Sequence, residues 1–459
     1  MNKQGRRNRN QLEFSETKSK FKTAIQILVA LAFTNVAVLV LLPSYLGFAS
    51  TSSLSYHVND GWCTDGQGIG THCFGDFYYP FNFTNLDAPW EGPQPIPYPP
   101  LSLYIFKIFR TISIDSPYSH LSLNIYLVIS ILAMLFPSFH LFRKQFIDKK
   151  IALILGAVTL MSTPMIASFD RGNLQMITTP FVYLCIFYFF TDNNKGFLIS
   201  SCILVLLKPQ YILLGAVFIG KREYRKLLNW ISVTSLTFLS TFLLYPVNIL
   251  ENLGDYLNQV KLFNQYQIAG ILFPPNLSFS SSISVIFRFI SESTPENISI
   301  ANSLFIPLWI TAILFILILF VIWRAGPNLN RYALMFTVLC FPILLPGVVF
   351  AYHASTLVLF FLFLAVQIHS ANFESINHRN SPTYFIQNRL NYFLTISITA
   401  LLFIPFAIPW NLIPRFSNFP DGNVTISWTL LQILIQTLFI RVILDLANRK
   451  KQTDKNNSY

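Results

Sequence analysis

Charged residues are scarce in this chain. Only 11% of its 459 residues are charged, whereas 53% are hydrophobic. A soluble domain carries about 25% charged residues, so the composition excludes an ordinary globular protein and predicts a membrane protein. The formal net charge is +12, and the basic residues gather in the termini and in short loops. That distribution is typical of membrane topology, so we do not expect the protein to bind nucleic acid.

Cysteine is also rare. Five cysteines are too few for a disulfide framework, and we expect Cys185, Cys202 and Cys340, which lie in apolar segments, to be packing residues. Cys63 and Cys73 share one polar loop, and the sequence leaves open whether they form a bridge. No cluster of His, Cys and Asp has metal-ligand spacing, and no P-loop or dinucleotide-binding motif is present. We therefore expect neither a metal nor a cofactor.

Lysine and arginine are absent from one long stretch near the N-terminus, Gly47 to Phe106. The acidic residues of this stretch are Asp60, Asp65, Asp76, Asp87 and Glu91. It is therefore an acidic loop in a basic protein.

Long apolar runs dominate the remainder of the chain. A membrane-crossing helix needs about 20 mostly apolar residues. The candidates are 24–48, 119–141, 151–169, 174–191, 228–248, 302–323, 332–350, 354–370, 391–410 and 425–444. The apolar core of the first run is too long for a typical signal peptide, so we expect a retained anchor helix. The predicted fold class is an all-α polytopic membrane protein with one transmembrane domain, 24–446, between basic tails 1–23 and 447–459.

The positions of lysine and arginine predict the orientation. The tail before Thr23 holds seven Lys or Arg residues and two Glu residues, and positively charged segments stay in the cytoplasm. Alternation from there places two large loops, 49–118 and 249–301, on the outer face and both termini in the cytoplasm. We expect short amphipathic helices in these loops, with Leu101 to Ile112 as the best candidate.

One segment does not fit a single crossing. Only about 25 residues separate Lys195 from the basic cluster Lys221 to Lys226, and both are expected inside. Pro209 removes a backbone donor and disfavours helix at Lys208. Residues 196–207 and 210–220 would then be the arms of a V with Lys208 at its tip, within the membrane. The alternative is one kinked helix with an exposed basic end outside.

The unusual polar residues fall on one side of this topology. Those assigned to the outer leaflet are Asp76, Asp170, Arg171, Asn173, Lys208 and His353. A transporter would carry ionisable residues near the midplane and helix breaks at matching positions in its two halves. Only one break is evident here, and the acidic loop is long, so the pattern favours a site at the outer face.

Several short motifs carry a family resemblance. They are FGDFYYP around Asp76, PYPPLSLY from Pro97, SFDRGNLQ from Ser168, LLKPQYILLG from Leu206, PPNLSFSSSISVIFR from Pro274 and AYHAS around His353. Together and in this order they resemble the family-87 glycosyltransferases, the polyprenol-phosphate-mannose-dependent alpha-1,2-mannosyltransferase type with the GT-C fold. Gln175 departs from the pattern, because an acidic residue is expected after the RGN sequence.

The resemblance implies an inverting transfer of a hexose, mannose foremost, from a polyprenyl-phosphate donor to a hydroxyl of a lipid or glycan acceptor at the outer face of the plasma membrane. A hydroxyl is a weak nucleophile, and a carboxylate can take its proton during attack. Asp76 is the candidate base. The leaving phosphate needs its charge compensated, and Arg171, Lys208 and His353 are the candidates for that role.

Each candidate also has a simpler interpretation. Asp76 is one of several loop aspartates, and Arg171 could pair with Asp170 or cap the helix near Asn173. Lys208 could reach the membrane surface through its long side chain, and His353 could be an interfacial residue. A sugar site could be lined by the aromatic residues Tyr79, Tyr98 and Trp90 together with Asp170 and Asn173. Alternatively, the three aromatic residues could be ordinary residues of the membrane interface. At the level of function, the alternatives are a flippase or transporter of lipid-linked sugars and a polymerase or ligase of surface glycan.

Overall fold

Every regular element that the structure describes is a helix. The computed structural model describes residues 26–27, 29–35, 37, 74–83, 89–91, 96–112, 120–246, 248–269, 279, 308–326, 329–345, 351–369, 385, 389–403 and 426–456. The α-helices of the first half are α3 (Gly75–Phe83), α4 (Pro100–Ile112), α5 (His120–Arg143), α6 (Lys149–Leu160), α7 (Thr163–Arg171), α8 (Gln175–Phe190), α9 (Asn194–Leu207), α10 (Ala216–Gly220) and α11 (Tyr224–Ser240). Those of the second half are α12 (Ile249–Ala269), α15 (Leu308–Ala325), α16 (Arg331–Leu344), α17 (Ser355–His369), α19 (Arg389–Leu401) and α20 (Ile426–Asn456). Short 3-10 helices are η2 (Pro209–Gly215), η3 (Thr241–Leu244) and η5 (Ala351–Ala354). The expected all-α class is confirmed for this part of the chain.

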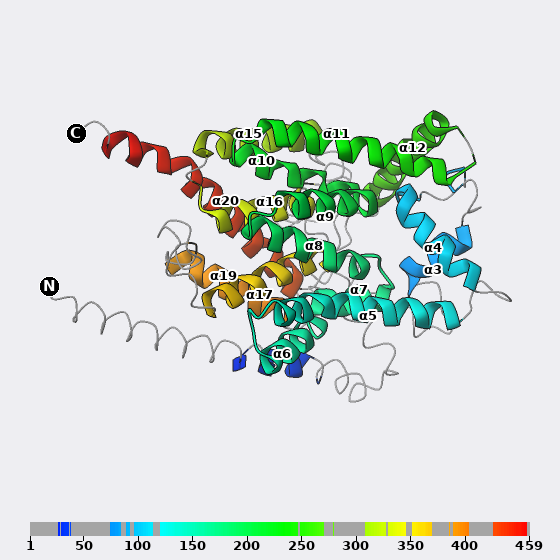
Figure 1. Cartoon of the computed structure of the whole chain (residues 1–459), viewed down its shortest axis with the longest axis horizontal. Coiled ribbons are helices and arrows are strands. Elements are labelled where there is room, and N and C mark those ends of the chain that lie inside the picture. The colour runs from blue at the N-terminus through cyan, green and yellow to red at the C-terminus, as the bar shows by residue number, and fades with distance from the viewer. Residues whose placement is uncertain are drawn as a thin grey trace, which may run out of the picture.

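The helices form an elongated bundle. The helices α3, α4 and α12 gather at one end of it, whereas the last turns of α20 lie at the opposite end (Figure 1). In the core of the bundle, every residue of α16 from Tyr332 to Leu344 is buried. Large apolar side chains such as Leu132, Leu236 and Ile316 are exposed on outer helices, as expected for surfaces that face lipid tails.

Three described helices are long and apolar enough to cross a membrane: Leu121–Arg143, Tyr224–Leu244 and Leu430–Ala447. Shorter apolar helices include α8, α9, α16 and α17. These helices support the prediction that the protein lies in a membrane. They do not establish the expected number of about ten crossings. The C-terminal helix continues to Asn456, beyond the predicted membrane-crossing segment 425–444, because the Arg, Lys and Gln residues that follow this segment are good helix formers.

The predicted span 151–169 is not one straight helix, because the chain bends within it. Helices α6 and α7 meet at 64°, and Pro164 lies in the first turn of α7, which begins after Ser162 and where a proline is tolerated. The amide of Asn35 donates to the carbonyl of Met161 at 2.6 Å, and the Thr163 amide donates to the carbonyl of Leu402 at 2.9 Å. These bonds satisfy backbone groups that the bend leaves without helical partners.

The chain reverses at Lys208, as the sequence predicted. Helix α9 ends at Leu207, Lys208 is extended, and η2 and α10 follow. The rings of Phe197 and Phe218, from the open ends of the two arms, lie 5.6 Å apart. Lys221 Nζ also lies 3.3 Å from Asp192 Oδ1, which precedes α9. Both ends of the segment therefore lie together, and a single kinked crossing is excluded.

The predicted helix 101–112 is observed as α4. It buries Leu103, Phe106 and Phe109, and the hydroxyl of Ser102 donates to the Leu207 carbonyl at 2.6 Å. Helix α4 therefore packs against the tip of the V.

Of the cysteines, Cys185, Cys202 and Cys340 are buried and free, whereas Cys63 and Cys73 lie outside the described residues.

Candidate active site

Helix α3 holds Asp76 in its first turn. The neighbouring Phe77 is fully buried and contacts the rings of Phe106, Phe109 and Tyr126, with centroids between 4.7 and 6.1 Å apart. Aromatic packing of this kind anchors a short helix whose own hydrogen bonds are few. The carboxylate is therefore carried on a segment fixed to α4 and α5.

The turn between α7 and α8 supplies the next residues of the site. Gly172 has φ +62°, its amide donates to the Phe169 carbonyl, and the Asn173 amide donates to the Ser168 carbonyl. This is the pattern of a Schellman motif, in which a left-handed glycine ends the helix. A Cβ atom on Gly172 would lie 2.8 Å from the Cβ atom of Phe77, so α3 and this turn are in close contact.

Asp76 is bonded by both residues that flank this glycine. Arg171 donates from a terminal guanidinium nitrogen to Asp76 Oδ1 at 3.1 Å, and Asn173 Nδ2 donates to Asp76 Oδ2 at 2.5 Å. The side chains of Arg171 and Asp76 are 22% and 14% exposed, so the pair is partly shielded from solvent. Arg171 thus pairs with a carboxylate in a different helix, and the side chain of Asp170 is outside the described part.

Lys208 and His353 complete the cluster. Lys208 Nζ lies 3.2 Å from Asn173 Oδ1 and 3.2 Å from His353 Nε2. The two side chains are 8% and 7% exposed. The structure therefore brings together Asp76, Arg171, Asn173, Lys208 and His353 from α3, the α7–α8 turn, the tip of the V and η5.

A second layer of polar groups lies beneath these residues. Gln175 Nε2 donates to Ser355 Oγ at 3.1 Å and to the Tyr211 hydroxyl at 3.3 Å. Tyr211 in turn bonds Thr356 at 3.0 Å, and Gln210 contacts His353. Sequence reasoning did not single out Gln210, Tyr211, Ser355 or Thr356, although each lies within three positions of a predicted residue. The polar residues that follow Lys208 and His353 within three positions were the available signal.

The aromatic candidates have different positions. Trp90 is 2% exposed and packs against Phe242, Tyr245 and Tyr256, so it anchors the loop to α12 instead of lining an open site. The Tyr98 ring is partly buried and packs against Phe106, with ring centroids 5.6 Å apart. The side chain of Tyr79 is not among those described, and neither are Asp60, Asp65 and Asp87.

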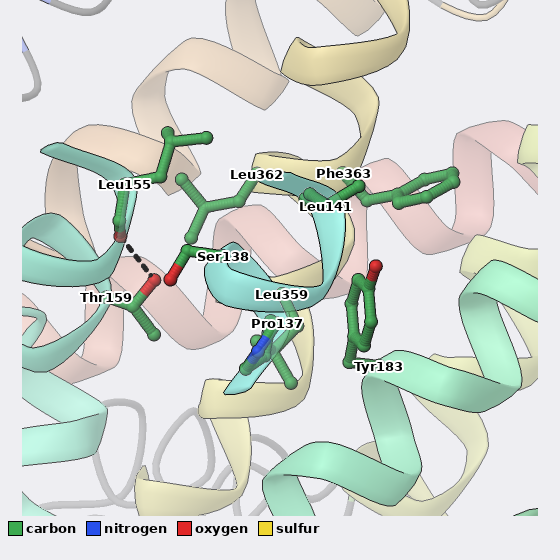
Figure 2. A pocket seen from close by; sticks show the side chains of 9 residues that line it. All are labelled: Pro137, Ser138, Leu141, Leu155, Thr159, Tyr183, Leu359, Leu362 and Phe363. Atoms are coloured by element: carbon green, nitrogen blue, oxygen red, sulfur yellow. Dashed lines mark hydrogen bonds between the residues drawn. The ribbon is translucent and has the colours of Figure 1, made fainter. Parts of the chain in front are cut away.

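A separate small cavity lies between α5, α6, α8 and α17 (Figure 2). Its lining is mostly leucine, proline and phenylalanine, with the hydroxyls of Ser138, Thr159 and Tyr183. Its volume of about 20 Å³ is close to that of one water molecule. Because Tyr183 lies eight positions along α8 from Gln175, the cavity is about 12 Å away along the helix axis. It is too small for a sugar.

The cluster around Asp76 has a clear chemical character. One carboxylate, which can accept a proton, lies within hydrogen-bonding distance of a guanidinium. The side-chain amide of Asn173 bonds both this carboxylate and the buried ammonium of Lys208. Cationic groups fixed in a low-dielectric site stabilise negative charge on a bound group. Among the described residues, no three His, Cys, Asp or Glu side chains are grouped to hold a metal ion.

The fold and this cluster define a helical membrane protein with a partly buried polar site at one end of its bundle. The model of glycosyltransferase family 87 matches residues 97–346, more than half of the chain, so this protein belongs to that family. Arg171, Asn173 and Lys208 lie inside the matched region, whereas Asp76 and His353 lie outside it. No curated protein and no solved structure matches the chain.

Proposed function

We propose that the protein is an inverting membrane glycosyltransferase that moves a hexose from a polyprenyl-phosphate donor to a hydroxyl of a lipid or glycan acceptor. The membership in glycosyltransferase family 87 supports sugar transfer. The polyprenyl-phosphate donor and mannose as the hexose rest on the motif resemblance. The observation that carries the proposal is the contact of Asp76 with Arg171 and Asn173.

Asp76 is the proposed general base. Its two oxygens accept hydrogen bonds from Arg171 and Asn173, and an ionised carboxylate has about four acceptor positions. The acceptor hydroxyl donates to one of the remaining positions and attacks the anomeric carbon. The bond from that carbon to the phosphate oxygen breaks, and the hydroxyl proton passes to Asp76. A single displacement of this kind inverts the anomeric configuration.

Arg171 and Lys208 are the proposed phosphate ligands. A guanidinium offers five N–H donors in a planar fork that matches the oxygens of a phosphate, and Arg171 is the guanidinium of this site. Lys208 adds an ammonium from the tip of the V, 3.2 Å from the same asparagine that bonds Asp76. Two cations of separate segments then stabilise the charge that develops on the leaving phosphate.

The site is proposed to lie at the outer face of the plasma membrane, with both termini in the cytoplasm. The basic clusters near Lys195 and Lys221 lie together at the open end of the V, and Lys208 lies at its tip. Because lysine and arginine concentrate on the cytoplasmic side, the tip with Asp76 belongs to the opposite side. Membrane lipid surrounds the domain, and the lipid tail of the donor enters from it.

The proposal is tested with membranes from cells that express the wild-type protein or no protein. The membranes contain native acceptors and are given polyprenyl-phosphate-[³H]mannose. We expect protein-dependent formation of a labelled glycoside of inverted configuration, with release of polyprenyl phosphate. Transbilayer movement of intact donor without a new glycosidic bond would contradict the proposal and would indicate a flippase.

A further inference from the structure

The imidazole of His353 lies between two nitrogen atoms. Its Nε2 atom is 3.2 Å from Lys208 Nζ and 3.0 Å from Gln210 Nε2. Both His353 and Lys208 are more than nine-tenths buried. The three residues come from two segments: the tip of the V contributes Lys208 and Gln210, and η5 contributes His353.

Both neighbours of Nε2 are hydrogen-bond donors. An ammonium has three N–H donors and no acceptor, and the amide nitrogen of glutamine only donates. The oxygen and nitrogen of the Gln210 amide are interchangeable by a flip, but the ammonium of Lys208 has no such alternative. With Lys208 charged, the Nε2 atom carries a lone pair, and a neutral ring then holds its proton on Nδ1.

A cationic imidazole does not fit this geometry. It would carry N–H groups on both ring nitrogens and would place a second positive charge 3.2 Å from the lysine in a buried site. Like charges at that separation repel strongly where the dielectric constant is low. His353 is thus a poor source of positive charge for a phosphate while Lys208 is charged.

Lys208 is held by two acceptors from different elements. Asn173 Oδ1 in the α7–α8 turn and His353 Nε2 in η5 each lie 3.2 Å from its Nζ atom. Two such bonds, made to separate segments of the chain, restrict where the ammonium can lie. The position of the cation is then restricted before a ligand arrives.

We infer that His353 is a neutral positioning residue, whose Nε2 atom accepts hydrogen bonds from Lys208 and Gln210 and thereby aims the Lys208 ammonium at the phosphate of the donor. The phosphate part of this inference rests on the proposed function. The protonation state of the ring does not, because it is argued from the contacts of His353 with Lys208 and Gln210.

The first test is ¹⁵N NMR of the full-length protein in nanodiscs, labelled on the histidine ring nitrogens. The resonances of His353 are those that disappear in His353→Gln. We expect Nε2 at the shift of an unprotonated ring nitrogen and Nδ1 at that of a protonated one. A protonated Nε2 would overturn the inference. His140 bonds the Tyr183 hydroxyl elsewhere in the bundle, so His140→Gln is the control that leaves the His353 resonances in place.

The second test compares two substitutions of opposite character. His353→Gln keeps an acceptor near the position of Nε2 and carries no charge, whereas His353→Arg keeps a positive charge and cannot accept. We expect kcat to fall about threefold in His353→Gln and at least about 100-fold in His353→Arg, the size of effect seen when a fixed electrostatic contact is lost. Equal activity, or a more active arginine variant, would overturn the inference.

The two tests separate this inference from the proposed function. If the protein transfers no sugar from polyprenyl phosphate, the proposed function fails, and the NMR measurement on the unreacted protein still decides the state of His353. If His353→Arg does not fold, as judged by its thermal unfolding midpoint, the NMR measurement alone decides.

Discussion

Asn173 Nδ2 donates a hydrogen bond to Asp76 Oδ2 at 2.5 Å, although 97 positions separate the two residues in the sequence. The same side chain accepts from Lys208 Nζ and from the amide of Gln175. Asn173 is 2% exposed. It therefore links the proposed base to the buried cation and to the first turn of α8.

Substitution of Asn173 by alanine tests this link. The variant leaves Asp76 without one of its donors and leaves the buried Gln175 amide without its acceptor. We expect sugar transfer to fall about 100-fold or more and the free energy of unfolding to fall by about 1–3 kcal/mol. Initial rates and denaturant unfolding in detergent measure the two effects.

The matched control is Asn193, which caps α9 at the other end of the bundle. Its Oδ1 atom accepts from the Gly196 amide at 2.9 Å, and the residue is exposed. Asn193→Ala should cost about 1 kcal/mol of stability as a lost helix cap while the transfer rate stays at the wild-type level. Equal loss of activity in both variants would show that the effect of Asn173→Ala is a general loss of folding.

Gly172→Ala tests the contact between α3 and the α7–α8 turn. An alanine at φ +62° costs roughly 1–2 kcal/mol, and its Cβ atom would meet the Cβ atom of Phe77 at 2.8 Å. We expect a lower unfolding midpoint and a transfer rate reduced at least about tenfold, because a misplacement of 1 Å in a reacting group costs rate. Gly75→Ala is the comparison, since nothing lies within 4 Å of its added Cβ atom, and it should behave as the wild type. A Gly172→Ala protein with normal activity would contradict the arrangement.

The ion pairs at the open end of the V predict a pH dependence of stability. Burial opposes ionisation of Asp192, but its hydrogen bonds and ion pairs with Arg331 and Lys221 outweigh burial and lower the pKa of its carboxyl group. Because the folded-state pKa is depressed, the stabilisation is present above the unfolded value of about 3.9 and is lost as pH falls through the folded value. Thermal unfolding in detergent should show Asp192→Asn less stable than wild type at pH 7, with the gap closing below about pH 4. A gap that persists at the lowest pH would contradict the ion-pair account.

Two residues of the cluster could be selected from sequence because each breaks a local pattern. Lys208 precedes a proline inside an apolar segment, and Arg171 adjoins a glycine between two apolar segments. The motif order added Asp76 and His353. Polarity in an apolar context, a local property of the chain, selected Lys208 and Arg171, whereas Asp76 lies in a polar loop and depended on the motif.

The partners of these residues could not be selected in the same way. Gln175 bonds Ser355 across 180 positions, and Asn35 bonds Met161 across 126. Hydrogen bonds of this kind depend on how the helices pack, which hydropathy does not report. The bend between α6 and α7 was missed for a related reason, since the apolar run is continuous there and only Pro164 marks the break. Gln175, expected to be acidic, is a buried amide that donates to two hydroxyls, as an ionised acid could not.

The central claim is that the Asp76 carboxylate takes the proton of the acceptor hydroxyl. Asp76→Asn keeps the size of the side chain and removes the basic oxygen, so the most direct measurement is single-turnover transfer from polyprenyl-phosphate-[³H]mannose by purified wild-type and Asp76→Asn proteins in lipid. We predict that the variant binds donor and loses at least about 100-fold in transfer rate, as expected for loss of a general base. Transfer at the wild-type rate by the folded Asp76→Asn protein would contradict the account.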